Sequence, residues 1–217
     1  MNQCSQSQRS QTKVKSKKPD FGRVAIVTGA SSGLGRELAV LFSRSGHVIL
    51  SGRDKDELER TRLLCSDPGN TTTVCGNLRD SETRTQLVSF ADLYGLHCLV
   101  CSAGEYLRGP LEKSDHLKIE SIIGSNLTAT ISLVRRIYPQ FVSNLDGMII
   151  HINSAAGKAI DSMEPAYVAS KHGAAAFFKA LRFEARKHNV RVLDVFSGAM
   201  QTPMMEYRDD YGEDSWP

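Results

Sequence analysis

The chain alternates between two spacings of apolar residues over most of its length. Short apolar runs rich in β-branched residues occur at 23–27, 47–50, 71–75, 96–101, 147–152 and 190–196. Between them, apolar residues recur three and four positions apart, as in Leu34, Leu38, Leu41 and Phe42. The first spacing is typical of strands buried on both faces and the second of amphipathic helices. The pattern therefore predicts strands that alternate with helices.

Cap and breaker residues set the ends of the expected helices. We predict helices at 34–46, 56–64, 81–94, 115–138 and 167–188. Ser81 is expected to cap the third helix, Gly95 to stop it, and Pro139 to terminate the fourth. This order of elements predicts an α/β fold, a single doubly wound domain of the Rossmann type. Its parallel sheet is expected to have the order 3-2-1-4-5-6.

The segment between the first strand and the first helix is rich in glycine. It reads Thr28-Gly29-Ala30-Ser31-Ser32-Gly33-Leu34-Gly35. Glycines permit tight turns and the close approach of a pyrophosphate, and a helix N-terminus offers free N–H groups and the positive end of its dipole. An ordinary loop is the alternative for such a turn by itself. The flanking strand and helix favour a phosphate-binding site.

Tyr167 and Lys171 lie four residues apart in Y-V-A-S-K, and Ser154 lies thirteen residues upstream, after an apolar run. Residues i and i+4 share a helix face, so the phenol and the ammonium can meet over one bound group. A nearby cation favours the phenolate and lowers the pKa of a tyrosine from about 10 toward neutrality. A serine hydroxyl could polarise the same carbonyl oxygen. This layout favours a carbonyl–alcohol redox site, although Y-x-x-x-K alone also occurs by chance on helices.

Together these segments resemble the short-chain dehydrogenase/reductase family. Four motifs carry the resemblance in register: T-G-x-x-x-G-x-G at 28–35, Ala103-Gly104, the tetrad Asn126, Ser154, Tyr167 and Lys171, and Gly198-x-x-x-Thr202. The resemblance runs from about residue 22 to residue 205. It is specific for the family and says little about the substrate.

The resemblance implies roles for these residues. Tyr167 would act as the general acid in reduction and the general base in oxidation, and Lys171 would hold the nicotinamide ribose. Ser154 would orient the substrate oxygen, and Asn126 would hold a water that links Lys171 to solvent. Ser154 and Tyr167 would contact the substrate, a small-molecule carbonyl or alcohol. The implied cofactor-binding residues are Gly29, Ser31, Ser32, Gly33, Leu34, Gly35, Arg53, Asn77, Leu78, Ala103, Gly104, Asn126, Tyr167, Lys171, Gly198 and Thr202.

Arg53 follows the second strand and bears on the choice of cofactor. An acidic residue there would accept hydrogen bonds from the ribose 2′-hydroxyl of NAD(H). A guanidinium suits a 2′-phosphate instead. We therefore expect NADP(H) to be preferred over NAD(H). The alternative is an ordinary surface charge beside Asp54 and Asp56.

Three positions depart from the family's pattern. Asn77 stands where the family usually has an aspartate near the adenine, and Cys101-Ser102 replaces a pair of asparagines that brace the sheet. Ser197 replaces a proline before Gly198. We expect a weaker adenine contact, less support for the sheet and a looser bend.

The match also ends early. Family members usually continue through a substrate-covering helical segment and a seventh strand, which this chain is expected to lack because it stops soon after residue 205. The sixth strand would then be an exposed edge. Two functions stay open. The complete tetrad favours an NADP(H)-dependent oxidoreductase, and the short C-terminal region favours a catalytically impaired nucleotide-binding or interaction protein that retains the fold.

Composition sets the N-terminal boundary of the domain. The first twenty residues hold five basic side chains, one acidic side chain and almost nothing apolar. We expect residues 1–20 to form a disordered basic tail and residues 21–217 to form the domain. The tail accounts for the net charge of +3. Contact with nucleic acid or membrane phosphate, and an organellar transit peptide, are the alternatives to a solvated leader.

The five cysteines are not spaced as a disulfide framework. Cys98 and Cys101 are three apart in a strand pattern and so point to opposite faces, which favours core thiols in a reducing cytosol over a metal site. No apolar stretch approaches the roughly 20 residues of a membrane span. We expect a cytoplasmic protein with no metal, no membrane span and no nucleic-acid partner.

The oligomeric state is open. By resemblance, the helices at 115–138 and 167–188 would pair between subunits of a homodimer or homotetramer. Residues 174–176, Phe177, Phe178 and Leu181 would lie at that contact or, equally well, in the core of one chain.

Overall fold

A computed structural model describes residues 22–160 and 163–204. Six strands form one sheet in the order β3-β2-β1-β4-β5-β6, and all five neighbouring pairs are parallel. This confirms the predicted fold class and strand order. The strands are β1 (Arg23–Thr28), β2 (Gly46–Gly52), β3 (Thr71–Cys75), β4 (Cys98–Cys101), β5 (Gly147–Ser154) and β6 (Val190–Ser197).

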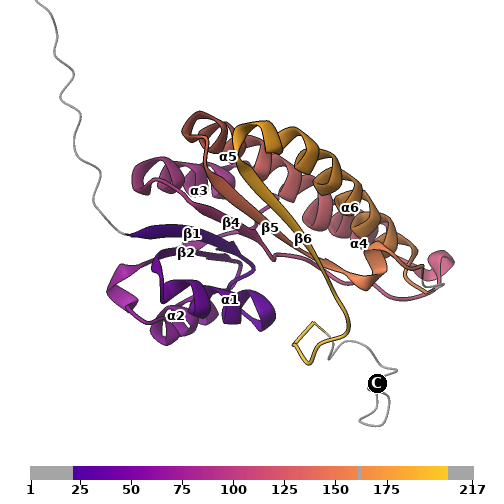
Figure 1. Cartoon of the computed structure of the whole chain (residues 1–217). Coiled ribbons are helices and arrows are strands. Elements are labelled where there is room, and N and C mark those ends of the chain that lie inside the picture. The colour runs from indigo at the N-terminus through magenta and orange to yellow at the C-terminus, as the bar shows by residue number, and fades with distance from the viewer. Residues whose placement is uncertain (1–21, 161–162, 205–217) are drawn as a thin grey trace, which may run out of the picture.

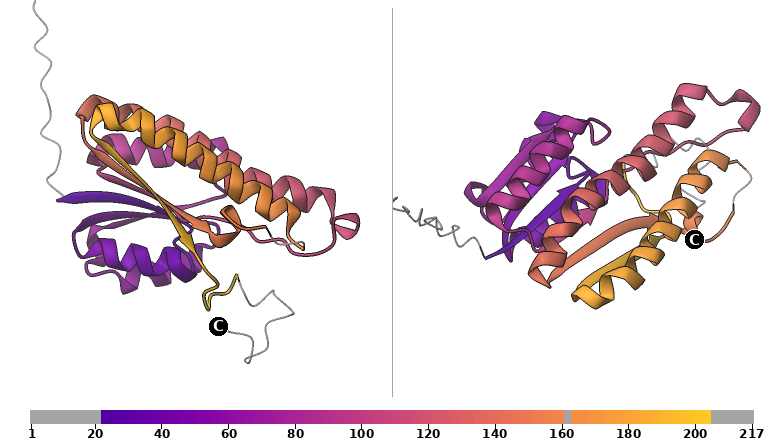
Figure 2. Two further views of the ribbon diagram at one scale, coloured as in Figure 1. Left: turned by 45° about the vertical axis from the view of Figure 1, so that its right-hand side comes forward. Right: turned by 90° about the horizontal axis from the view of Figure 1, so that it is seen from above.

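Helices cover the two faces of the sheet unequally (Figure 1). On one face lie α1 (Gly33–Ser43) and α2 (Lys55–Leu64), which pack on the first three strands. The other face carries α3 (Ser81–Tyr94), α4 (His116–Ile123), α5 (Thr130–Asn144) and α6 (Pro165–Ala185). The left view of Figure 2, turned by 45°, shows the two layers of helices on opposite sides of the sheet. Because α1 and α2 stop short of β5 and β6, Leu193 on this side of the sheet is 49% exposed.

Alternate residues of the strands fill two separate cores. Ile26 and Leu99 belong to the core beneath α3, α5 and α6, whereas Val27 and Val100 belong to the core beneath α1 and α2. Cys101 lies in the first core and Cys98 in the second. Burial raises the pKa of the Cys98 thiol to about 12 and also raises that of Cys101. The interpretation of these cysteines as core thiols on opposite faces is confirmed, and the described residues contain no cluster that could hold a metal.

Two helix-end predictions are wrong. Asp80, not Ser81, is the N-cap of α3, and Ser81 is the first helical residue. Pro139 lies inside α5, which continues to Asn144. A proline removes the hydrogen bond to the carbonyl four residues back. Here that carbonyl belongs to Arg135, and both Arg135 and Pro139 are exposed, so water can replace the lost bond while Ile137 and Phe141 keep the helix packed.

The helix predicted at 115–138 is present but contains one irregular turn. Between α4 and α5, residues Gly124–Ala129 form a wide π-helical turn. A π turn inserts one extra residue into a helix and is frequent at functional sites. This turn carries Asn126, whose side chain is 1% exposed and faces the interior.

Several expectations concern segments beyond the domain core. The tail at 1–20 and the residues from 205 onward lie outside the described residues. Of the residues considered for subunit pairing, Ala174, Phe178 and Leu181 are buried in the core of the single chain. β6 is the edge of the sheet within the described residues. None of the helices in the described part of the chain is both long enough and apolar enough to cross a membrane.

Candidate active site

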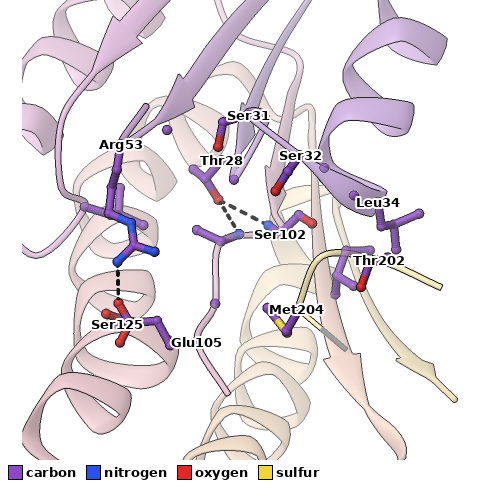
Figure 3. A pocket seen from close by; sticks show the side chains of 18 of the residues that line it. Thr28, Ser31, Ser32, Leu34, Arg53, Ser102, Glu105, Ser125, Thr202 and Met204 are labelled. Carbon is purple, nitrogen blue, oxygen red and sulfur yellow. Dashed lines mark hydrogen bonds and ion pairs between the residues drawn. The ribbon is translucent and has the colours of Figure 1, made fainter. Parts of the chain in front are cut away.

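A cleft opens at the carboxyl ends of the parallel strands, where β1 and β4 diverge (Figure 3). This is the topological switch point at which doubly wound sheets bind ligands. Its walls come from the turn after β1, the ends of β2 and β3, the segment after β4, α6 and the segment after β6. The lining residues include Thr28, Gly29, Ser31, Ser32, Gly33, Leu34, Gly35, Arg53, Asn77, Leu78, Ala103, Gly104, Glu105, Tyr167, Lys171 and Thr202.

The turn after β1 is closed so tightly that two of its glycines admit no side chain. A Cβ on Gly35 would lie 2.1 Å from the backbone oxygen of Gly29. Gly29 has φ of 71°, and a Cβ there would lie 2.8 Å from Cα of Ala103. Thr28 Oγ1 accepts hydrogen bonds from the backbone N–H groups of Ser102 and Ala103 at 3.1 Å each. The turn is therefore bound directly to the segment after β4.

Helix α1 starts at this turn with unpaired donors. Ser32 is its N-cap, and the first i→i−4 backbone hydrogen bond runs from Arg36 to Ser32. The N–H groups of Gly33, Leu34 and Gly35 thus have no partner within the helix, and all three residues line the cleft. Free N–H groups and the helix dipole suit an anion. The cradle and these donors together fit the pyrophosphate of a dinucleotide.

The far end of the cleft carries a charged pair. Arg53 Nη1 donates to Glu105 Oε1 at 2.7 Å, a contact drawn in Figure 3. Nearby, Asn77 Oδ1 accepts from the backbone N–H of Arg79 at 3.0 Å. The side chain of Asn77 therefore supports its own turn and still faces the cleft.

Tyr167 and Lys171 lie on the inward face of α6, each 7% exposed. Lys171 Nζ is 5.7 Å from the centroid of the Tyr167 ring and 3.4 Å from the backbone oxygen of Ile152. Burial lowers the pKa of Lys171 to about 8, and the negative charge of Asp194 partly opposes that shift. The ring of Tyr106 packs edge-on against Tyr167, with centroids 5.0 Å apart.

A buried polar network lies beneath these two residues. His151 Nδ1 and Asp194 Oδ1 are 2.7 Å apart, with side chains 3% and 5% exposed. Asn153 Nδ2 donates to Asp194 Oδ2 at 3.2 Å and to the backbone oxygen of Lys171 at 3.3 Å. Asn153 Oδ1 accepts from the backbone N–H of Ser154 at 2.9 Å. The network joins β5, β6 and α6, and it fixes Ser154 and Lys171 relative to each other.

Asn126 uses its amide to hold the segment after β4. Its Oδ1 accepts from the backbone N–H of Glu105 at 2.7 Å, and its Nδ2 donates to the backbone oxygen of Glu105 at 2.9 Å. The same Nδ2 donates to Ser170 Oγ at 3.1 Å. Asn126 therefore lies behind the cleft wall.

Most residues expected at the site line one cleft, and three do not. Asn126 is behind the wall as described, Gly198 is exposed beyond β6, and Ser154 caps the turn after β5 by accepting from Ala156 N at 3.2 Å. Ser197, where a proline was expected, donates its Oγ–H to the backbone oxygen of Asn153 at 3.0 Å.

Sequence reasoning missed several residues of the site. They are Glu105, Tyr106, His151, Asn153, Ser170 and Asp194. Asp194 and His151 did carry a signal, because each is a titratable residue inside an otherwise apolar strand pattern. Glu105 carried none, since a glutamate in a loop is ordinarily a surface charge.

Comparisons with known proteins agree with this geometry. A family model described as short chain dehydrogenase matches residues 23–212. Sepiapterin reductase of Chlorobaculum tepidum is 30% identical over 198 residues, a match that covers 86% of this chain and 81% of that protein. The chain spans 81% of that reductase and 57% of dehydrogenase/reductase SDR family member 7 of Mus musculus, to which it is 30% identical.

Solved structures give the same result. Actinorhodin polyketide ketoreductase with NADPH has a TM-score of 0.81 and 28% identity, covering 87% of this chain and 76% of that chain. A putative NAD(P) dependent gluconate 5-dehydrogenase from Beutenbergia cavernae, with bound NADP at low occupancy, has a TM-score of 0.79 and 29% identity, covering 85% and 75%. The chain belongs to the short-chain dehydrogenase/reductase family of NAD(P)-dependent oxidoreductases.

Proposed function

We propose that the protein is an NADP(H)-dependent oxidoreductase that interconverts a carbonyl group and a secondary alcohol. The observation that carries the proposal is the position of Tyr167 and the buried Lys171 on a cleft that begins at a glycine-rich helix N-terminus. A bound nicotinamide would supply the hydride. The protein supplies position, a proton and protection from water.

Tyr167 would exchange that proton with the substrate oxygen. A phenol works poorly near neutral pH unless its anion is favoured, and a nearby ammonium favours it. Since the pKa of Lys171 is lowered to about 8, its side chain is still mostly charged at pH 7. The same ammonium would hold the ribose hydroxyls, so that one buried group positions the cofactor and tunes the acid.

Ser154 and Asn126 would complete the site. The Ser154 hydroxyl accepts a backbone hydrogen bond, and its own O–H can donate to a substrate oxygen. The amide of Asn126 is bound to Glu105 and Ser170. We therefore propose that the backbone carbonyl of Asn126, and not its side chain, binds the water that links Lys171 to solvent.

Arg53 supports the preference for the phosphorylated cofactor. It lies at the end of the cleft away from Tyr167, just after β2, and its side chain is 65% exposed. A planar guanidinium binds a phosphate through two donors. NADPH or NADP is named in the two structurally similar proteins described above.

Turnover by the purified chain tests the proposal. The chain is incubated with NADPH or NADH and a panel of ketones and aldehydes, and the loss of reduced-cofactor absorbance is followed. We expect carbonyl-dependent oxidation that is faster with NADPH. Tight NADPH binding without turnover on any carbonyl would contradict the enzymatic proposal and favour an impaired nucleotide-binding protein. Faster turnover with NADH would contradict the cofactor preference.

A further inference from the structure

Arg53, the residue proposed to hold a 2′-phosphate, already has an anionic partner within the cleft. Its guanidinium meets the Glu105 carboxylate at 2.7 Å across the groove (Figure 3). In the part of the chain that the structure describes, Glu105 is the one carboxylate paired with Arg53. The two residues are 52 positions apart and come from segments after different strands, so the contact spans the groove instead of running along one wall.

Glu105 is held in this position from several sides. Asn126 binds its backbone N–H and its backbone oxygen, at 2.7 Å and 2.9 Å. Ser121 Oγ donates to the second carboxylate oxygen at 2.7 Å. The Glu105 side chain is 22% exposed, whereas that of Arg53 is 65% exposed. The carboxylate is therefore fixed, and the guanidinium is the partner that can move.

A 2′-phosphate and Glu105 would compete for one guanidinium, of which Glu105 already uses Nη1. Bidentate binding of a phosphate uses two N–H groups on one edge of the guanidinium. If Arg53 kept its contact with Glu105, the phosphate would lie beside a fixed carboxylate, and like charges at such a distance repel. An ion pair this exposed stabilises little. Arg53 can therefore leave Glu105 when a phosphate arrives, at a small cost in affinity for the phosphate.

We propose that Glu105 is a specificity-determining residue whose carboxylate competes with the 2′-phosphate of NADP(H) for Arg53. The competition weakens binding of NADP(H) and leaves binding of NAD(H) unaffected. It therefore reduces the difference in affinity between the two cofactors. This inference rests on the proposed function, because it takes Arg53 as the phosphate-binding residue. Glu105 keeps its contacts with Ser121 and Asn126 in both states.

Two adenosine fragments isolate the effect. Adenosine 2′,5′-bisphosphate and adenosine 5′-monophosphate differ only in the 2′-phosphate, and their binding to the full chain is measured by calorimetry. Glu105→Gln keeps the shape of the side chain and an acceptor for Ser121 but removes the charge. We expect it to tighten binding of the bisphosphate about two- to fivefold, the upper part of the range of an exposed ion pair. Binding of the monophosphate should stay within about twofold, which also reports that the variant is folded.

Asp56→Asn is the matched control. Asp56 is exposed in the first turn of α2, three residues from Arg53, and its replacement removes the same charge without touching the pair. We expect a smaller effect on the bisphosphate than that of Glu105→Gln. Equal tightening by both variants would overturn the proposal, because a general change in electrostatic potential would then explain it.

A double-mutant cycle completes the test. Arg53→Ala should weaken binding of the bisphosphate about tenfold, and in that background Glu105→Gln should no longer strengthen it. If the wild type prefers the bisphosphate through Arg53 but Glu105→Gln changes nothing, the inference about Glu105 fails alone. If neither the wild type nor Glu105→Gln distinguishes the two fragments, the proposed cofactor preference fails as well.

Discussion

The two ends of the cleft hold their charges in different ways. At the catalytic end, Lys171 is 7% exposed, and it lies above Asp194 and His151, whose side chains are also buried. At the adenosine end, the Arg53 side chain is mostly in solvent and pairs with Glu105. A buried charge loses its hydration and is expensive to move, whereas an exposed pair costs little to break.

This difference suits the two tasks proposed for the cleft. Proton transfer needs reacting groups held at fixed distances, which a buried network provides. Cofactor entry and release need contacts that can open and close. Variants at each end of the cleft, and changes of pH and of salt, test this division.

Tyr167→Phe should separate catalysis from binding. Removing the hydroxyl takes away the acid–base group, and the rate should fall about 10²- to 10⁴-fold. Calorimetry should find NADP⁺ affinity within about twofold of the wild type, because the adenosine end is untouched. Tyr138→Phe is the matched control, since the Tyr138 hydroxyl is remote on α5 and buried with no hydrogen-bond partner in the described structure. A parallel loss of rate and affinity in Tyr167→Phe would contradict the division.

Asp194→Ala should destabilise the fold more than any change at the adenosine end. It removes a buried carboxylate that contacts His151, whose pKa burial lowers, and that accepts from Asn153; leaving these two partners unsatisfied costs about 1–3 kcal/mol each in the free energy of unfolding. Arg53→Ala breaks an exposed pair and should cost no more than about 1 kcal/mol. Urea denaturation of both variants gives the comparison. Similar losses would mean that the network beneath Lys171 is not a structural anchor.

Lys171 should make stability depend on alkaline pH. Its pKa is about 8 in the folded chain, against an ordinary value of 10.5, so between these values the unfolded chain binds a proton that the folded chain does not. Lys171 should therefore contribute a rise in the free energy of unfolding from pH 8 to pH 10.5, while the buried thiols of Cys98 and Cys101, whose pKa values are raised, contribute a fall. Comparison with Lys171→Met isolates the rise. Lys171→Met should lack this rise, gain up to about 3 kcal/mol at pH 7 and lose turnover. Urea denaturation of both chains across this range checks the prediction, and an equal pH dependence in Lys171→Met and the wild type would mean that Lys171 contributes nothing to it.

Salt should weaken charge interactions at the adenosine end of the cleft and leave those at the catalytic end nearly unchanged. Exposed charges are screened at high ionic strength, and buried charges much less. Raising sodium chloride from about 0.05 M to about 0.5 M should reduce the preference for adenosine 2′,5′-bisphosphate over the monophosphate severalfold. The pH at which Lys171 titrates in the stability profile should stay nearly constant. If that pH shifted by an amount equivalent in free energy to the change in preference, the two ends of the cleft would not differ in how strongly salt screens their charges.

The fold could be predicted from the sequence because its signals are local and agree with one another. Each strand coincides with a short run made mostly of apolar or β-branched residues, and Gly95 does end α3 in the left-handed conformation. The prediction failed at Pro139, where burial of Ile137 and Phe141 outweighs a local breaker. Local patterns state a preference, and tertiary packing decides when the two disagree.

Only part of the site could be predicted from the sequence, for a related reason. The glycine-rich turn and the Tyr167–Lys171 pair are short-range patterns. The contacts Arg53–Glu105 and His151–Asp194 join residues 52 and 43 positions apart. The order of the strands in the sheet brings such pairs together, and no local sequence pattern predicts these contacts.

The wide turn at Gly124–Ala129 makes this stretch of the chain intolerant of changes in length. Successive residues of an α-helix are rotated by about 100° around its axis. The extra residue in the π turn therefore changes, by one such rotation, which side chains after the turn face the same side as those before it. Deleting a single residue there would let an uninterrupted helix form, but Ile122 and Leu133 could then no longer both reach the interior. Insertions and deletions in related chains should accordingly be rare across this helical stretch.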